Sequence, residues 1–394
     1  MMPPVAVTGL GVFCSIGENA SAFWSSLLAG KSGVGSLTRF PAGDIRSPIA
    51  AEAPEPGGDQ ANRVDRLALR AAREALAHAG LERLPEQAGI ALGAGVGGLP
   101  ESEVAFGAML ADGKLGRRGR LRSFLGHLPA TTADVLALEF GAKGARTSVT
   151  NACSSSTVAV GQGGLWIAEG ETDCVLAGAS DALSMLTVGG FNALRVVSPD
   201  RPRPFDKNRS GMAVGEGAAF LVLESLERAR ARGARILALL EGFGLSVDAY
   251  HATAPEPNGK GALRAMRLAL ECAGASASDI DHVNAHGTAT VANDLAEAKA
   301  IAELLGDRVS EVPVTSLKGA VGHCLGAAGA IEAAAAVLSI LHQMVPPNVG
   351  LLEKDPQIPL RLLMRAESHS IRKALSLNLA FGGNNAAVLF GRAP

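Results

Sequence analysis

Two segments of the chain resemble each other and begin 165 residues apart, at positions 149 and 314. The segment VTNAC at 149–153 is echoed by VTSLK at 314–318. Each segment precedes a stretch of small residues typical of a tightly packed helix, and each carries a polar residue at the turn. Two such strand-turn-helix units predict a duplicated fold with one site between its halves.

Strand-like and helix-like segments alternate through all 394 residues, which is typical of an α/β fold whose sheets are covered by helices. A composition of 47% hydrophobic and 19% charged residues fits a well-packed core of this kind. The segment around 227–244 is a plausible crossing point, so we predict halves at residues 1–241 and 242–394. No low-complexity linker separates the halves, and we expect one fused body.

Charge and cysteine content restrict the function. A formal net charge of −2 gives no argument for nucleic-acid or membrane binding. The five cysteines include no C-x-x-C pair, which indicates neither a disulfide framework nor a zinc site and fits a reducing compartment. The N-terminus has no signal-peptide pattern, and the apolar run after Glu332 ends at His342. We therefore expect a cytoplasmic protein without a membrane span.

Cys153 lies in NACSSST, where a predicted strand meets a predicted helix. A cysteine at a helix N-terminus is exposed to the positive end of the helix dipole, which favours the thiolate over the thiol. The small residues that follow indicate close backbone approach. Cys153 is thus either a nucleophile or a buried structural cysteine.

Two histidines lie in glycine-flanked loops that follow predicted strands. They are His286 in HVNAHGTATVAND and His323 in VTSLKGAVGHCLGAAGAIE. No carboxylate or further histidine stands at metal-ligand spacing around them, so we expect no metal. Lys318 and Glu332 flank His323 and form either a surface pair or a buried ion pair that holds a site together.

Two glycine-rich segments allow more than one interpretation. The loop Phe381-Gly382-Gly383 is either a tight hairpin or a source of backbone N–H groups for an oxyanion. GAGVGG at 93–98 matches the dinucleotide-binding pattern G-x-G-x-x-G. A proline follows it closely, and no strand ends in Asp or Glu about twenty residues later. This disfavours nucleotide binding.

An ordered set of segments resembles the β-ketoacyl synthase family along nearly the whole chain, specifically its elongating, acyl-carrier-protein-dependent type. In chain order the segments are VAVTGLGVFCSIGENASAFWSSLLAGKSGV, NACSSS, RPFDKNRSGMAVGEGAAFLVLE, AYHATAPEPNGKGALRAMRLAL, NAHGTATVAND, SLKGAVGHCLGAAGAIE and AFGGNNA. The resemblance implies the thiolase fold, in which two βαβαβαββ halves form a layered α-β-α-β-α body. It also implies an acyltransferase with no bound cofactor, whose substrates are carried on the phosphopantetheine arm of an acyl carrier protein.

The resemblance assigns roles to residues of this chain. Cys153 would carry the acyl chain as a thioester, while His286 and His323 would hold the malonyl thioester and stabilise the enolate formed when CO2 leaves. Lys318 and Glu332 would support the site, and the N–H groups of Cys153 and Phe381 would form an oxyanion hole. The expected substrate-binding residues are Thr288, Thr290, Phe191 and Gly382, with the two threonines on the phosphopantetheine arm.

Residues 62–80 predict an amphipathic helix that Gly80 ends. Its arginines recur at helical steps of three, four and three, and a second basic cluster follows near residue 117. These stripes are either ordinary solvated faces or docking surfaces for an acidic acyl carrier protein. The expected docking residues are Arg63, Arg66, Arg70, Arg73, Arg117 and Arg118.

The sequence departs from the family pattern at four places, one of which is a short segment before RPFDKNRSG. Gly-Thr-Gly-Thr is Gly-Thr-Ala-Thr here, Ser156 replaces a glycine, and the C-terminal loop has one phenylalanine where the family has two. These changes suggest a specialised polyketide or polyene pathway.

Two alternatives to a homodimeric β-ketoacyl synthase remain open. One is the active half of a heterodimer with a chain-length factor, and the other is a CoA-dependent thiolase. A thiolase needs a second cysteine near the C-terminal glycine loop, which AFGGNNAA lacks.

Overall fold

The computed structural model describes residues 2–60, 62–111 and 124–394. Its main elements follow the same order twice. The first set is β1 (Val5–Cys14), α2 (Arg63–His78), β4 (Gly89–Gly93), α5 (Ala130–Phe140), β5 (Arg146–Val149), α6 (Ser155–Ala168), β6 (Cys174–Asp181) and β8 (Gly217–Glu224). The second set is β9 (Ala238–Val247), α9 (Lys260–Ala273), β10 (His282–Asn284), α10 (Val291–Leu305), β11 (Pro313–Thr315), α12 (Ala328–His342), β15 (Lys373–Ala380) and β16 (Asn384–Gly391). Both sets read β-α-β-α-β-α-β-β, which confirms the predicted duplication.

Shorter elements decorate this repeat. The helices are α1 (Ala20–Leu28), α3 (Leu99–Ala111), α7 (Met185–Ala193), α8 (Leu226–Ala231) and α11 (Lys318–Val321). The strands are β2 (Val34–Ser36), β3 (Ile49–Ala51), β7 (Val214–Gly215), β12 (Met344–Val345), β13 (Arg361–Leu362) and β14 (Glu367–Ser368). The 3₁₀ turns are η2 (Ala152–Ser154), η3 (Ala277–Asp279), η4 (Gly306–Ser310), η5 (Leu325–Ala327) and η6 (Phe381–Gly383).

Strand order is also repeated. The first repeat is ordered β1-β8-β6-β4-β5, and the second is ordered β9-β16-β15-β10-β11, with β13 added at its edge. An antiparallel pairing of β1 with β9 joins the two into one eleven-stranded sheet. Because β9 starts at Ala238, the expected boundary between residues 241 and 242 falls inside this strand, and we place the start of the second half at the strand's first residue.

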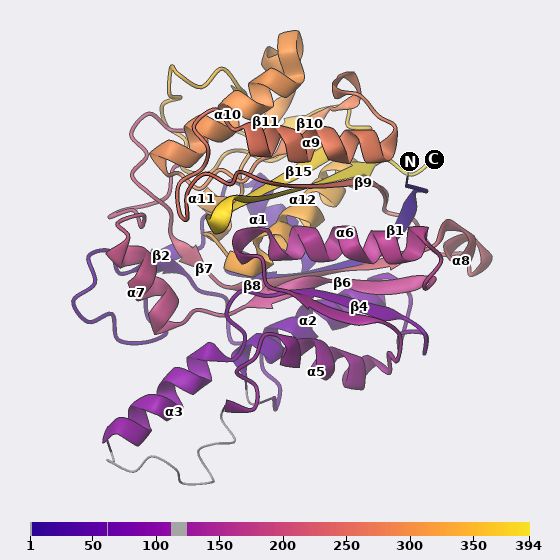
Figure 1. Ribbon diagram of the computed structural model, residues 1–394, viewed down its shortest axis with the longest axis horizontal. Helices are drawn as coiled ribbons and strands as arrows, with labels where there is room; N and C mark the ends of the chain where they lie inside the picture. The colour runs from indigo at the N-terminus through magenta and orange to yellow at the C-terminus, as the bar shows by residue number, and fades with distance from the viewer. Residues whose placement is uncertain (1, 61, 112–123) are drawn as a thin grey trace.

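The repeats stack into five layers (Figure 1). Helices α9 and α10 cover the strands of the second repeat, α2 and α5 cover those of the first, and α6 and α12 lie between them. The predicted α-β-α-β-α body is therefore confirmed. Helix α12 is buried from Ala328 to Ile340, which requires small residues because strands or helices surround it. At Gly329 a Cβ would lie 2.1 Å from the Thr157 hydroxyl on α6.

One helical segment of the described residues, Leu325–His342, has the length and mean hydropathy of a membrane span. However, 89% of it is buried inside the protein, where it forms the central layer. Its apolar character is explained by packing between the two halves of the sheet.

The glycine pattern at 93–98 also serves packing. At Gly93 a Cβ would lie 2.5 Å from the backbone of Ser156, so β4 and the start of α6 approach more closely than any side chain permits. The helix predicted at 62–80 forms as α2, and Gly80 follows it with a φ of +68°. Both features come from backbone requirements that only glycine meets.

Gly93→Ala tests this close approach. We expect the variant to lose about 1–3 kcal/mol of unfolding free energy because the methyl group meets backbone atoms that cannot move independently. Thermal or urea unfolding measures the loss. Gly107→Ala on α3 is the matched control, since its Cβ meets no atom within 4 Å. An unfolding midpoint for Gly93→Ala equal to that of the control would contradict the packing account.

Candidate active site

Cys153 lies in a strained turn between β5 and α6. Ala152, the residue before it, has φ of +49°, which is rare outside glycine. Serine side chains hold the turn: the Ser155 hydroxyl donates to the Ala152 carbonyl at 2.6 Å and accepts from the Asn151 N–H at 2.8 Å. The turn places Cys153 at the N-terminal end of α6 with 8% of its surface exposed. Strain of this kind collects at functional sites.

The second repeat contains the same strained turn. Leu325 has φ of +51° and stands three residues before α12, as Ala152 stands three residues before α6. The structural counterpart of Cys153 is therefore Gly326, whereas the VTNAC–VTSLK echo had pointed to Lys318. The echo aligns strands β5 and β11 correctly, but α11 is inserted before the second turn and shifts its register.

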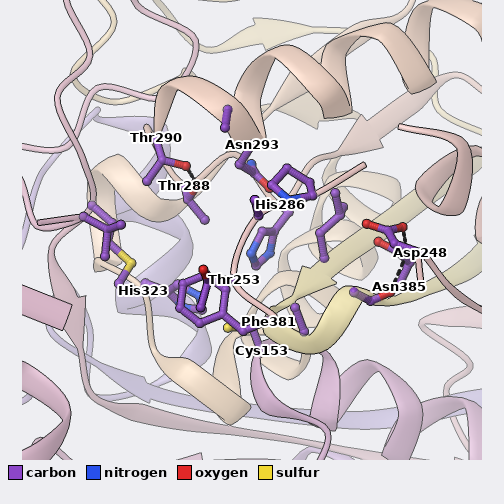
Figure 2. Close-up of a pocket in the computed structure, with 18 of the residues that line it drawn as sticks. Cys153, Asp248, Thr253, His286, Thr288, Thr290, Asn293, His323, Phe381 and Asn385 are labelled. Carbon is purple, nitrogen blue, oxygen red and sulfur yellow. Dashed lines mark hydrogen bonds between the residues drawn. The ribbon is translucent and has the colours of Figure 1, made fainter. Parts of the chain in front are cut away.

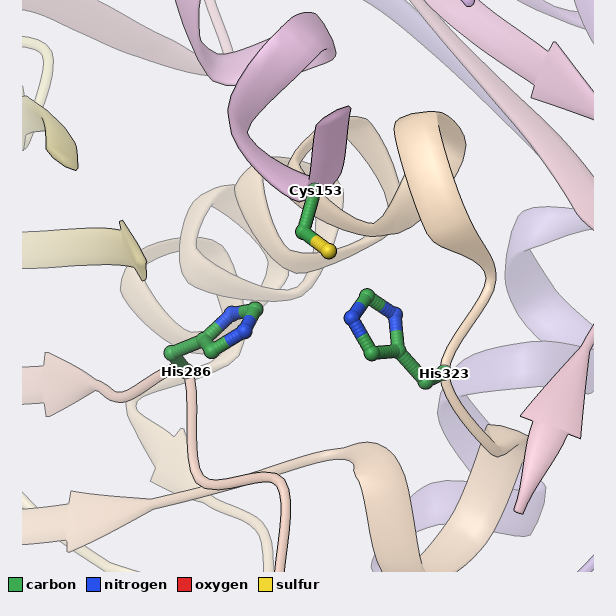
Figure 3. Close-up of side chains that lie close together, drawn as sticks. All are labelled: Cys153, His286 and His323. Carbon is green, nitrogen blue, oxygen red and sulfur yellow. The ribbon is translucent and has the colours of Figure 1, made fainter. Parts of the chain in front are cut away.

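Three side chains from distant segments meet in the pocket. The sulfur of Cys153 and ring nitrogens of His286 and His323 lie within 4.8 Å of one another. The two imidazole rings stand edge to face, with centroids 5.2 Å apart. Figure 3 shows the Cys153 sulfur pointing toward the space between the two rings. Two donors and a nucleophile thus face one small volume.

Hydrogen bonds determine which ring nitrogen carries the proton. Nδ1 of His286 lies 3.2 Å from Nζ of Lys318 and 3.2 Å from Nδ2 of Asn378, both of which are donors. Nδ1 of His323 accepts the N–H of Leu325 at 3.2 Å. Each Nδ1 is therefore an acceptor, which leaves the proton of a neutral ring on Nε2. Both rings present an N–H to the pocket.

Burial keeps these rings neutral. It lowers the pKa of His286 and that of His323 well below the usual value, and the positive charge of Lys318 lowers both pKa values further. At neutral pH such an imidazole stays uncharged and donates a hydrogen bond through its Nε2–H. The pair is suited to binding an oxygen that gains negative charge.

Lys318 and Glu332 form a buried ion pair with their charged atoms 2.5 Å apart. Lys318 also donates to the His286 carbonyl at 2.5 Å, and Asn378 donates to Glu332 at 2.6 Å. Thr157 on α6 donates to Asn378 at 2.6 Å, so the network reaches the helix that Cys153 precedes. Of the two interpretations of Lys318 and Glu332, the buried pair is correct and the surface pair is wrong.

The Cys153 thiol is not stabilised as a thiolate in this pocket. Burial raises its pKa to about 11, although Lys318 and a hydrogen bond from the Phe381 N–H act in the opposite direction. The expected thiolate is therefore wrong for the pocket without substrate, because desolvation of the sulfur outweighs the effects of Lys318 and the Phe381 N–H. The Phe381 N–H nevertheless faces the sulfur, as an oxyanion-hole donor would.

A cavity of about 160 Å³ opens onto these residues. Thr288 and Thr290 line it, with their hydroxyls 2.9 Å apart (Figure 2). Phe191 also lines it and packs against Phe381 with ring centroids 5.9 Å apart. Gly382 does not line the cavity: it is exposed and donates its N–H to the Ala252 carbonyl at 2.8 Å. The adjacent Gly383 forms the cavity wall instead.

Several polar residues of the site were not predicted. They are Asn378 and Thr157 in the ion-pair network, Glu297, Asp248, Asn385 and Asp181. Glu297 accepts the N–H groups of His286 and Gly287, and burial raises its pKa to about 8. Asp248 accepts from Asn385 at 2.7 Å beside the cavity (Figure 2). A carboxylate that ends the otherwise uncharged strand β6 was the available signal for Asp181.

Cys153, His286 and His323 are the one group in the described part of the chain whose donor atoms could surround a metal ion. The expectation of no metal relied on ligand spacing along the sequence, which cannot detect ligands from three separate segments. Nζ of Lys318 lies 3.2 Å from Nδ1 of His286. A cation bound by His286 would therefore be repelled by the nearby positive charge of Lys318. The charge of Lys318 disfavours a cation here.

Comparison with known proteins follows the same division into repeats. Residues 2–229 match the family model of the beta-ketoacyl synthase N-terminal domain, and residues 237–352 match that of the C-terminal domain. The chain belongs to the β-ketoacyl synthase family. It is therefore an acyltransferase-class condensing enzyme.

Relatives cover the whole chain. Nodulation protein E of Rhizobium meliloti (strain 1021) is 37% identical, with 98% of each chain covered. The 3-oxoacyl-[acyl-carrier-protein] synthase 2 of Coxiella burnetii (strain RSA 493 / Nine Mile phase I) is 36% identical, again with 98% of each covered. Among solved structures, the ishigamide ketosynthase/chain length factor superposes with a TM-score of 0.94 at 37% identity, covering all of both chains.

Two departures of this β-ketoacyl synthase from the family pattern are accommodated locally. Ala289, at the position of a family glycine, keeps a φ of +65° and donates its N–H to Asp294. The additional hydroxyl of Ser156 accepts the Ala330 N–H of α12 at 2.9 Å. Both changes leave the Cys153–His286–His323 group in place, so these two changes alone do not indicate a specialised pathway.

Only part of the predicted basic stripe on α2 is exposed. Arg63 is 5% exposed and pairs with buried Glu216 at 2.8 Å, so its assignment as a docking residue is wrong. It lies at the first turn of α2, where the preceding loop covers the helix. Arg66 is partly buried beside Glu55, whereas Arg70 and Arg73 are exposed. Arg117 and Arg118 lie outside the described residues.

The raised pKa of Cys153 predicts its reactivity. The rate of alkylation by iodoacetamide should rise with pH toward a midpoint of about 11, against about 8.5 for a free cysteine, because only the thiolate reacts. Intact mass spectrometry of the Cys272→Ser variant, which removes a half-buried second thiol, measures the rate at each pH. A midpoint at or below that of a free cysteine would show that burial does not control this thiol.

Proposed function

We propose that this chain catalyses decarboxylative Claisen condensation of malonyl-acyl carrier protein with an acyl chain held on Cys153, in fatty-acid or polyketide synthesis. The observation that carries the proposal is the pair of neutral imidazoles, each with Nε2–H directed into the pocket beside the Cys153 sulfur. Two N–H donors converging on one position suit a thioester oxygen that becomes an enolate oxygen.

Cys153 receives the acyl group first. Its sulfur attacks the thioester carbonyl of an acyl carrier, the carrier thiol leaves, and the acyl group remains on Cys153. The N–H groups of Cys153 and Phe381 would stabilise the oxyanion of this step. A sulfur nucleophile fits the reaction because the same atom must later act as the leaving group.

The malonyl unit reacts second. The bond between its carboxylate carbon and the adjacent carbon breaks, CO2 leaves, and the electron pair forms an enolate whose oxygen accepts from His286 and His323. The enolate carbon attacks the acyl carbonyl on Cys153, and the sulfur leaves. The product is a β-ketoacyl chain on the carrier that brought the malonyl unit.

The substrate arm enters beside Thr288 and Thr290. These hydroxyls line the cavity and suit the amide groups of a phosphopantetheine arm, so substrates arrive on that arm and no separate cofactor takes part. The name of the Coxiella burnetii relative, 3-oxoacyl-[acyl-carrier-protein] synthase 2, supports an acyl carrier protein as the partner. The free cysteines of the described residues support a location in the cytoplasm.

A homologous subunit is the second proposed partner, either a copy of this chain or a chain-length factor. The name of the ishigamide ketosynthase/chain length factor supports the second possibility. Large apolar side chains exposed on α3, α5 and the segment before α5 support a protein contact there. They are Val104, Leu110, Leu125, Leu128 and Leu138.

A thiolase activity is not supported by the cysteines. A CoA-dependent thiolase requires a second cysteine in the pocket. Cys324 follows His323 in sequence, but it is buried, directs its thiol to the Val321 carbonyl, and is absent from the cavity lining.

The proposal predicts which step each residue serves. Incubation with an acyl-carrier-protein thioester should add one acyl group to the chain, and Cys153→Ala should abolish the addition. His286→Ala and His323→Ala should retain self-acylation but lose malonyl decarboxylation by about 10²–10³-fold, the usual effect of removing one oxyanion donor. Intact mass spectrometry and CO2 release measure the two steps.

Two outcomes of this experiment would contradict the proposal. Acylation that persists in Cys153→Ala would place the nucleophile elsewhere. Equal loss of self-acylation and decarboxylation in the histidine variants would contradict their role as donors to the malonyl oxygen.

We also propose that Arg70 and Arg73 contribute to docking of an acidic carrier protein. Arg70→Glu should lower kcat/KM for carrier-bound substrate roughly tenfold and weaken its salt dependence, because a surface charge acts mainly on association. Kinetics with an acyl-pantetheine substrate, which lacks the protein, should be unchanged. Arg267→Glu on the outer helix α9 is the matched control, since it makes the same exchange at another exposed arginine. Equal effects of both variants would exclude docking at α2.

A further inference from the structure

Asp181, the last residue of β6, is a fully buried carboxylate held by backbone N–H groups. It accepts from Gly95 and Val96 at 2.9 Å each and from Gly326 at 2.6 Å. Ala327 supplies a further backbone N–H. Burial raises the pKa of Asp181 to about 6, although these N–H groups act in the opposite direction. The carboxylate therefore depends on the two loops that surround it.

The donors belong to different repeats. Gly95 and Val96 follow β4 in the first repeat, while Gly326 and Ala327 form η5 in the second. The approach is close: a Cβ at Gly95 or at Gly326 would lie 2.7 Å from Oδ2 of Asp181 and would displace the carboxylate. Asp181 thus joins the loop that begins at β4 to the turn that follows His323.

The turn held by Asp181 controls the orientation of His323. The short strand β7 and the residue before it hold the His323 backbone, because the His323 N–H donates to the Ala213 carbonyl and its carbonyl accepts from the Gly215 N–H. The orientation of the His323 ring depends on a different contact, in which the Leu325 N–H donates to its Nδ1. Leu325 has the strained φ of +51° and directly precedes Gly326, which Asp181 holds. Without that anchor the strain favours relaxation of the turn.

We propose that Asp181 is a positioning residue for the condensation, which holds the Leu325–Ala327 turn so that Leu325 keeps the Nε2–H of His323 directed at the substrate oxygen. This inference rests on the proposed function. Asp181 does not touch the reacting atoms, and it acts through Gly326 and Leu325 on His323.

Asp181 supports the action of His323, but its charge makes the Cys153 thiol less reactive. Its negative charge raises the pKa of the Cys153 thiol, in addition to the larger effect of burial. Removal of the charge should therefore impair the histidine-dependent step while leaving the thiol equally or more reactive. Loss of structure alone would impair both.

Asp181→Asn is the principal test. The amide has nearly the same shape but carries no charge and directs an NH2 at backbone donors. We expect malonyl decarboxylation to fall about 10- to 100-fold, the range expected when a catalytic group is misplaced by up to an ångström. The rate of Cys153 alkylation at fixed pH should stay equal or rise. Asp281→Asn is the matched control, since Asp281 is also buried and accepts two backbone N–H groups, from Arg372 and Lys373, but precedes β10.

Gly95→Ala perturbs the same carboxylate without changing its charge. The added methyl approaches Oδ2 of Asp181, the movable end of a side chain, so the fold should persist even if Asp181→Asn does not fold. We expect this variant to lose decarboxylation while its alkylation rate does not increase. Unfolding midpoints of all variants show which ones are folded.

The inference is overturned if folded Asp181→Asn decarboxylates at the rate of Asp281→Asn, or if decarboxylation and alkylation fall together. If Asp181→Asn does not fold, normal decarboxylation by Gly95→Ala overturns it. Failure of the proposed function is distinguishable, because the unaltered protein would then show no acyl group on Cys153.

Discussion

A buried ion pair between Lys318 and Glu332 underlies the arrangement of the pocket. Breaking such a pair by removing one partner typically costs about 3–5 kcal/mol, because the other charge stays buried without compensation. Here the pair also connects elements: Glu332 lies in the central helix α12, Lys318 donates to His286, and Asn378 and Thr157 extend the network to α6. The middle layer of the fold therefore supports the chemistry as well as the packing.

This network explains why the two histidines act as donors. Lys318 and Asn378 occupy Nδ1 of His286 as donors, the Leu325 N–H does the same for His323, and burial keeps both rings neutral. The same burial raises the pKa of the Cys153 thiol. One low-polarity pocket thus holds two neutral donors and a protonated sulfur, and charge develops only when substrate is present.

The sequence predicted the duplicated fold and the residues that meet in the pocket, because both follow from local patterns repeated in order. It placed the counterpart of Cys153 at Lys318, since an inserted helix is invisible to a comparison of strands. Helical spacing put Arg63 on an exposed stripe, but burial of its first turn depends on a distant Glu216. Asn378 and Asp181 were missed because their roles come from partners 46 and more residues away in sequence. Long-range contacts of this kind require the structure.

The central claim is that both imidazoles are neutral and protonated on Nε2. NMR of protein labelled with ¹⁵N in its histidines, recorded near pH 7 and assigned with His286→Gln and His323→Gln, measures this most directly. The account predicts ¹⁵N shifts of a protonated Nε2 and an unprotonated Nδ1 for both residues. An imidazolium, or a proton on Nδ1, at either residue would contradict it.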